Sequence, residues 1–283
     1  MKRAMTDLWK IQHVTHVRTC NTWNNNANTA RKGYFILRII RLIMCIIAIV
    51  MLTISAGLAQ LLTPDDERFT PEAARRMINA SQELLSPGYN PLAKQIVADY
   101  DLADKAFGIG IDLGSGPGKL IVELCRYTRI HWINADINPH FFAHFYAEAD
   151  KQGFANRVSA IFADAQALPF RDNYADIIVS RGSYHLWEDK LMAFSEIMRV
   201  LKPGGVAYIG RGFARDMPVD IARSIRAKQS GIIDFDPHVK AGELKKLCEK
   251  LQIEKFRIEI PGPPNAEDVN YGIWIELRAP CIR

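Results

Sequence analysis

Two hydrophobic periods alternate along residues 107–283. Short apolar runs flanked by turn residues predict strands, and apolar residues three or four positions apart predict helices between them. The predicted strands are 107–113, 130–136, 158–163, 175–180, 205–210, 254–260 and 271–279, and the predicted helices are 118–127, 139–152 and 189–201. This alternation favours a mostly parallel sheet covered on both faces. We therefore predict an α/β fold, a doubly wound seven-stranded sheet ending in an antiparallel hairpin.

The N-terminal part has a different pattern. Residues 1–33 are polar and basic without periodicity, which predicts a disordered segment. Residues 42–62 carry no charge, and 21 residues are enough to span a bilayer as a helix. We assign 34–63 as a transmembrane or signal segment, preceding the sheet as a hydrophobic helix. If this segment is retained, it implies membrane association. If it is a signal peptide cleaved at the small residues near 57–59, it implies export. A true start at Met51 implies a cytoplasmic protein.

Residues 64–106 are predicted as a helical lead-in to the domain at 107–283. Thr70 followed by Pro71 is typical of a helix start. The segment 86–91 is rich in Pro and Gly and predicts a turn, and 92–102 predicts a second helix before the first strand.

Charge and cysteine content exclude several classes of function. The net charge of the 283 residues is +5, but residues 1–63 hold eight Lys and Arg against one Asp, which leaves 28 basic and 30 acidic residues in 64–283. A domain with a net charge of −2 does not favour nucleic-acid binding. The five cysteines include no C-x-x-C pair, so we expect free thiols and no metal.

The first strand runs into a glycine-rich turn and then a helix, the order found at nucleotide-type ligand sites. Its pattern is Asp112-x-Gly114-x-Gly116-x-Gly118. The dinucleotide spacing G-x-G-x-x-G is absent, which disfavours a nicotinamide enzyme. Further acids end the next strands. Asp136 either offers a two-pronged acceptor for a ribose diol or caps the helix from Pro139 onward, and Asp164 either binds a ligand or caps its turn.

These motifs resemble motif I and the following acidic loops of the class I S-adenosylmethionine (SAM) methyltransferases. The stretch from Glu196 to Gly205, E-x-x-R-V-L-K-P-G-G, resembles their ubiquinone/menaquinone-biosynthesis-like branch. In the family, the acid at Asp136 binds the ribose of SAM and the one at Asp164 the adenine. The resemblance implies SAM as cofactor, bound by Asp112, Gly114, Ser115, Gly116, Gly118, Asp136, Ile137, Asn138, Asp164, Ala165, Gln166 and Ser180.

Residues after the fourth strand face the methyl group and the acceptor in this family. Tyr184 and His185 have the chemistry to orient or deprotonate an acceptor, although a single His is also a common structural residue. Arg181 either binds an acidic substrate or pairs with a neighbouring acid. The apolar stripe at 213–240 either covers the acceptor or packs as core. We predict methyl transfer from SAM to a small-molecule acceptor by in-line displacement; the alternative is a non-catalytic, membrane-tethered protein that binds SAM or its demethylated product.

Overall fold

The computed structural model describes residues 69–229, 235–264, 266 and 268–281, all within the compact unit Asp65–Arg283. The predicted disordered segment 1–33 and the hydrophobic segment 34–63 lie outside these residues. Among the helices that are described, none is long and apolar enough to cross a membrane.

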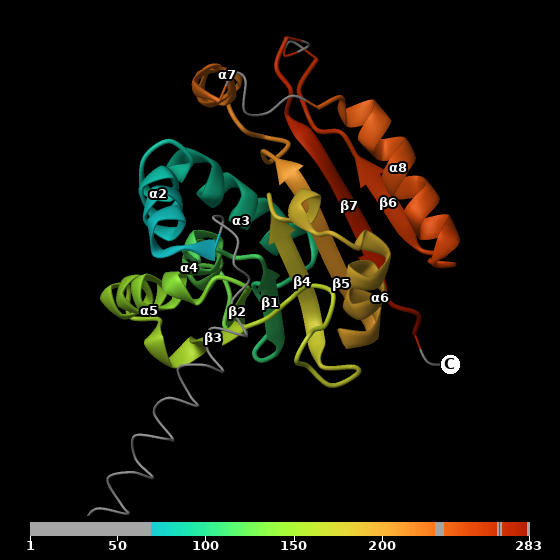
Figure 1. Ribbon diagram of the computed structural model, residues 1–283, viewed down its shortest axis with the longest axis horizontal. Coiled ribbons are helices and arrows are strands. Elements are labelled where there is room, and N and C mark those ends of the chain that lie inside the picture. Colours follow the sequence, from blue (N-terminus) through green and yellow to red (C-terminus); the bar gives the residue numbers. More distant parts are fainter. Residues whose placement is uncertain (1–68, 230–234, 265, 267, 282–283) are drawn as a thin grey trace, which may run out of the picture. The chain divides into compact units, whose positions relative to one another are not determined.

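One seven-stranded sheet forms the centre of the domain (Figure 1). Its strands are β1 (Ile109–Leu113), β2 (His131–Asp136), β3 (Val158–Phe162), β4 (Ala175–Arg181), β5 (Leu201–Gly212), β6 (Phe256–Glu259) and β7 (Gly272–Arg278). The spatial order is β3-β2-β1-β4-β5-β7-β6, with β1 to β5 parallel and β7 antiparallel to both β5 and β6. The predicted fold class and C-terminal hairpin are confirmed.

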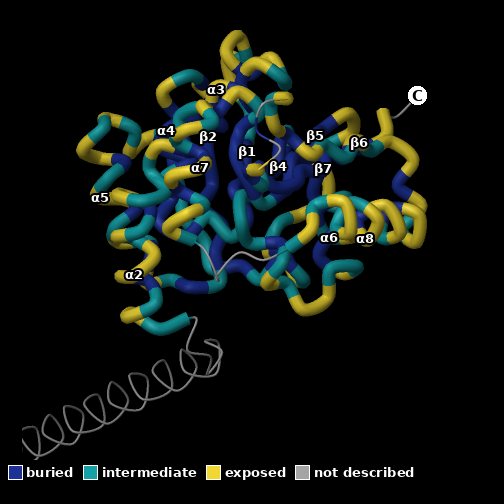
Figure 2. Tube along the Cα trace, turned by 90° about the horizontal axis from the view of Figure 1, so that it is seen from above, coloured by how far each residue is buried: buried dark blue, intermediate teal, exposed yellow. Residues whose placement is uncertain are grey.

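Helices cover both faces of the sheet. They are α2 (Pro71–Gln82), α3 (Tyr89–Asp99), α4 (Lys119–Cys125), α5 (Phe142–Lys151), α6 (Lys190–Val200), α7 (Val219–Lys228) and α8 (Pro237–Lys250). The apolar core has one large cluster on each face: α6 and α8 pack in one, and α3, α4 and α5 in the other. Seen from above, the buried strands lie between helices whose outer sides are exposed (Figure 2).

Strand β4 shows why a continuous apolar run predicts a strand buried on both faces. Ile178 packs in the cluster under α6, whereas its neighbours Ile177 and Val179 pack in the cluster under α3. Successive side chains of a strand point to opposite faces, so a strand buried on both faces reads as a continuous apolar run.

Two boundaries differ from the prediction. Helix α3 begins at Tyr89, inside the segment predicted as a turn, because Pro91 lies in the first helical turn, where its missing N–H removes no helical bond. Strand β5 begins at Leu201 rather than 205. The helix before it does end as predicted, with extended backbone at Leu201, but pairing of Leu201 with Ala175 already adds this stretch to the sheet.

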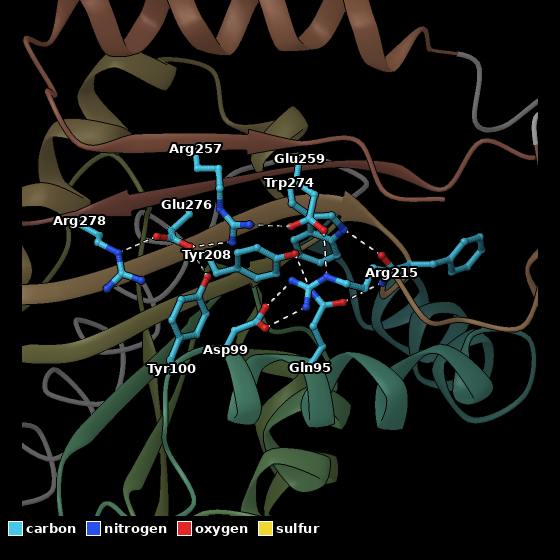
Figure 3. Close-up of polar contacts among 11 residues, drawn as sticks. Gln95, Asp99, Tyr100, Tyr208, Arg215, Arg257, Glu259, Trp274, Glu276 and Arg278 are labelled. Carbon is cyan, nitrogen blue, oxygen red and sulfur yellow. Dashed lines mark hydrogen bonds and ion pairs between the residues drawn. The ribbon is translucent and has the colours of Figure 1, made fainter. Parts of the chain in front are cut away.

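Polar contacts fasten α3 to the C-terminal strands (Figure 3). Gln95 donates to the Tyr208 hydroxyl at 2.8 Å, and Asp99 accepts two hydrogen bonds from Arg215, at 2.9 and 2.5 Å. Arg215 also pairs with Glu259 on β6 at 3.1 Å. The lead-in therefore contributes to the core and the polar framework of the domain.

Candidate functional site

The glycine turn after β1 has left-handed backbone at three positions. Gly114, Gly116 and Gly118 have φ values of 68°, 56° and 74°. A Cβ atom at Gly114 would lie 2.3 Å from Ser183, and one at Gly118 would lie 2.0 Å from Phe145, so packing alone requires both glycines. At Gly116 the nearest atom would be 3.9 Å away. A methyl group there would make ordinary contacts, so the left-handed backbone, and not packing, favours glycine at this position.

Two buried carboxylates flank the turn. Asp136, at the end of β2, accepts hydrogen bonds from the backbone N–H groups of Gly116 (2.7 Å) and Asn138 (2.8 Å). Asp112, at the end of β1, accepts from the Ser115 hydroxyl at 2.7 Å through one oxygen, while its buried Oδ1 has no partner among the described residues. Burial raises the pKa of Asp112 to about 7 and that of Asp136 to about 6. Both acids are poised for a ligand that supplies donors or positive charge.

The residues after Asp136 make their polar contacts within the protein. The side chain of Asn138 is buried and accepts from the N–H of His140 at 3.1 Å, which caps the short helix at Pro139–Phe141. Ile137 is half-buried, and its backbone N–H lowers the pKa of Asp136 against the larger effect of burial. Asn138 and Ile137 thus shape the loop that holds the acid.

The loop after β3 lies beside this acid. Ala163 donates its N–H to the backbone oxygen of Asp136 at 3.0 Å. The Asp164 carboxylate accepts from the N–H of Gln166 at 2.9 Å and from its side-chain amide at 3.1 and 3.2 Å, and Ala165 is buried. Asp164 caps its own turn, and the structure places that turn next to the end of β2.

The end of β4 is tied to the glycine turn by two hydroxyl groups. Ser180 and Ser183 share a hydrogen bond of 2.7 Å, and Ser183 donates to the backbone oxygen of Leu113 at 2.9 Å. Ser180 therefore lies close to the turn, linked to it through Ser183.

Tyr184 and His185 lie on a separate cavity of about 200 Å³. The cavity is lined by Tyr184, His185, Lys190, Arg211, Phe235, Lys240, Glu243, Leu244 and Leu247. Burial, with Arg211 and Lys190 nearby, lowers the pKa of His185 to about 4, so the ring is neutral at pH 7. Its Nδ1 is buried without a partner in the described part of the chain. None of the glycine-turn residues lines this cavity.

Arg181 lies toward α3, on the ring of Tyr89. Its guanidinium is 4.5 Å from the centre of that ring, and its Nη2 would be 3.3 Å from a Cβ at Gly88. It forms no ion pair with a described residue. Two further arginines, Arg211 and Arg226, approach the same region, and the sequence prediction missed both. The sequence did carry a signal for Arg211, because it is a basic residue at the end of β5, as Arg181 is at the end of β4.

Comparison with known proteins gives this arrangement a family. Residues 111–209 match a family model described as a methyltransferase domain. The fold superimposes on the crystal structure of a putative S-adenosyl-L-methionine-dependent methyltransferase from Methanococcus maripaludis, with a TM-score of 0.66 and 27% identity, covering 78% of this chain and 98% of the other. The domain has the class I methyltransferase fold, and residues 111–209 are similar to a methyltransferase domain.

Curated relatives match part of this methyltransferase domain. A ubiquinone/menaquinone biosynthesis C-methyltransferase, UbiE, from Vibrio cholerae is 34% identical over 125 residues, 44% of this chain and 48% of that protein. A mitochondrial arginine-hydroxylase, NDUFAF5, from Mus musculus is 31% identical over 143 residues, 50% of this chain and 39% of that protein. The chain thus spans about half the length, or less, of the curated relatives it matches.

The methyltransferase site fits SAM by its own chemistry. The unpartnered Oδ1 of Asp112 is a buried acceptor without a donor among the described residues, and it lies beside the glycine turn. SAM carries positive charge and a ribose diol, which are the groups that buried carboxylates bind. Met77 of α2 and Phe141 border the space over Gly116, since a Cβ at that glycine would lie 3.9 and 4.0 Å from their side chains.

Proposed function

We propose that the chain transfers the methyl group of SAM to a small-molecule acceptor by in-line displacement. The observation that carries the proposal is the convergence of two buried acids on the glycine turn, where Asp112 accepts from Ser115 and Asp136 from the N–H of Gly116. The match to a methyltransferase family model supports it, as does the similarity to a relative named as a C-methyltransferase of quinone biosynthesis. A relative named as a hydroxylase makes a direct test of methyl transfer necessary.

In this proposal different cofactor residues bind different parts of SAM. Asp136 accepts from the ribose hydroxyls with the lone pairs left free by its two backbone bonds. Asp112 uses its unpartnered oxygen for the positively charged methionine part. The turn at Asp164 to Gln166 would hold the adenine, and Gly114, Gly118 and Ser115 shape the turn between the two acids.

On the acceptor side, Tyr184 and His185 border the cavity next to β4 and β5. Bound SAM supplies an electrophilic methyl group, so the protein needs chiefly to align the acceptor and exclude water. A histidine with a pKa of about 4 is a weak base at pH 7. We therefore assign His185 to hold the acceptor through its free Nδ1 rather than to remove a proton unaided.

Calorimetric titration of the full chain with SAM, S-adenosylhomocysteine (SAH) and NADH tests the cofactor. We expect micromolar binding of SAM and SAH and none of NADH. Asp136→Ala should weaken SAH binding at least about tenfold, roughly the loss of one or two hydrogen bonds to a charged group. The exposed Asp150→Ala on α5 is the matched control. Unchanged affinity in Asp136→Ala would place the ribose elsewhere, and SAH binding without methyl transfer to any acceptor would favour the non-catalytic alternative.

Association with a membrane through 42–62 and export by a cleaved signal both stay predictions of the sequence. They concern residues outside the described part of the chain, and the proposed chemistry depends on neither.

A further inference from the structure

Three arginine side chains gather above the carboxyl ends of β4 and β5. Arg181 ends β4, Arg211 lies near the end of β5, and Arg226 comes from α7. Their guanidinium groups stack on aromatic rings, at 4.5, 5.0 and 4.4 Å from the centres of Tyr89, Phe235 and Phe213. Burial, and the charges of Arg181 and Arg211, lower the pKa of Arg226 to about 10. The three charges therefore act on one another.

The carboxylates of the described residues leave this arginine cluster without an ion pair. Within the described residues, none of the three forms an ion pair. The Nε of Arg181 and the Nη2 of Arg226 are buried without any hydrogen-bond partner there. Asp112 is the acid whose charge Arg181 affects, lowering its pKa against the larger effect of burial. Unpaired buried donors on charged groups are costly, and a folded protein keeps them where a ligand completes them.

Other arginines of the domain show the usual arrangement. Arg223, one helical turn before Arg226 on α7, pairs with Asp268 through two hydrogen bonds of 2.9 and 3.0 Å. Arg199 pairs with Glu196 at 2.7 Å. Acids are thus available to arginines across the surface, while the arginine cluster faces the region assigned to the acceptor.

We propose that the acceptor carries an oxyanion, a carboxylate or a phosphate, which binds between Arg181, Arg211 and Arg226. Guanidinium groups bind carboxylate and phosphate oxygens through paired N–H donors. Phe235, Leu244 and Leu247 line the cavity beside Arg211 and offer apolar surface to the rest of the same molecule. The inference rests on the proposed function and names its substrate class: an amphipathic small-molecule anion.

The carboxylate of SAM is a second anion that three arginines of this kind can bind. The position of the arginine cluster favours the acceptor. Arg211 lines the cavity of Tyr184 and His185, which the glycine turn does not reach, and Arg226 belongs to α7, after β5. Asp136 and the turn at Asp164 follow β2 and β3, at the other half of the sheet. A cofactor held there still leaves Arg211 and Arg226 unneutralised.

The test is a titration of the full chain, saturated with SAH, with benzoate, phenyl phosphate and the neutral benzamide. We expect benzoate or phenyl phosphate to bind at least about tenfold more tightly than benzamide. Arg226→Gln and Arg211→Gln should lower the affinity for the anion at least about tenfold and leave SAH affinity within about twofold. Arg223→Gln, on the same helix but paired at the surface, is the matched control and should change neither.

The outcomes separate the two proposals. Absence of SAH binding by the wild-type chain refutes the proposed function whatever the anions do. With SAH bound, the inference alone is overturned if neither benzoate nor phenyl phosphate binds more tightly than benzamide, or if Arg226→Gln keeps full anion affinity. Competition between SAH and the anion also overturns it, because the arginine cluster then holds the cofactor's carboxylate. If Arg226→Gln does not fold, Arg226→Lys replaces it, and the wild-type comparison of the two anions with benzamide still decides.

Discussion

Asp112 offers the sharpest test of the cofactor site, because its replacement should stabilise the free protein while weakening cofactor binding. Its side chain is buried, one oxygen accepts from Ser115, and the other has no partner in the described part of the chain. Burial raises its pKa from 3.8 to about 7. The charged form is therefore disfavoured in the folded, unliganded state, and Asp112→Asn removes that charge at constant shape.

The size of the effect follows from the pKa difference. Between 3.8 and about 7 there are about three pH units, each equivalent to about 1.4 kcal/mol, so ionised Asp112 costs at most about 4 kcal/mol above pH 7. The amide of Asn keeps the Ser115 bond but places an unpartnered N–H group where Oδ1 was, at about 1–3 kcal/mol. We expect a net gain of about 2 kcal/mol at pH 8, or roughly 4–8 °C in Tm.

The sign of the pH dependence is fixed by the raised pKa. The folded state keeps its proton up to about pH 7, whereas the unfolded state loses it above about pH 4, so this residue makes stability fall as pH rises between 4 and 7. The wild type should lose stability between pH 4 and pH 7, and Asp112→Asn should lack the part of this loss that Asp112 causes. Urea unfolding of both proteins without cofactor, at pH 5 and pH 8, measures the difference, and the exposed Asp216→Asn is the control.

SAH binding supplies the other half of the test. Removing the carboxylate that faces the charged end of the ligand should weaken SAH at least about tenfold. The reasoning is refuted if Asp112→Asn is no more stable than the wild type at pH 8, or if its advantage does not shrink at pH 5. Greater stability with unchanged SAH affinity would separate Asp112 from the cofactor.

Two other features give independent predictions. Gly118→Ala should destabilise the domain by about 2–4 kcal/mol in urea unfolding and abolish SAH binding, because its Cβ would lie 2.0 Å from Phe145. Gly153→Ala, with a similar φ of 76° and no atom within 4 Å, should cost only about 1 kcal/mol, and equal losses would contradict the steric explanation. A double-mutant cycle of Asp99→Asn and Arg215→Met should give a coupling energy of about 1 kcal/mol, whereas additive losses would show that this pair does not fasten α3.

Most of the fold could be predicted because burial on two faces leaves a clear pattern. The predicted strand 130–136 differs from the observed β2 by one residue, since its apolar run ends in an acid and a proline follows soon after. The start of α3 could not be placed, because Pro91 is as compatible with a turn as with the first turn of a helix. Local sequence does not distinguish the two, and packing of Leu92 and Ile96 on the sheet decides.

That Asp112 and Asp136 lie together at the glycine turn could also be predicted, for a geometric reason. Parallel strands end at one edge, so acids that close successive strands must come together, and Asp112 and Asp136 do so around Gly116. The packing requirement at Gly114 was not readable, because Ser183 approaches it from another part of the chain. Nor did the sequence show that Asp164 would cap its own turn with Gln166.

Of the arginine cluster the sequence indicated Arg181 alone, because net charge does not show local imbalance of charge. Residues 64–283 sum to −2, which indicates a nearly neutral domain. Several of the acids in this sum are nevertheless bound to other bases: Asp99 and Glu259 to Arg215, and Glu276 to Arg257 and Arg278 (Figure 3). Burial raises the pKa of Glu276, but hydrogen bonds from Arg278 and Arg257 outweigh it and leave the value low. A domain can therefore be neutral overall and still hold an unneutralised arginine cluster, and only the pairing of individual side chains reveals where an anion is needed.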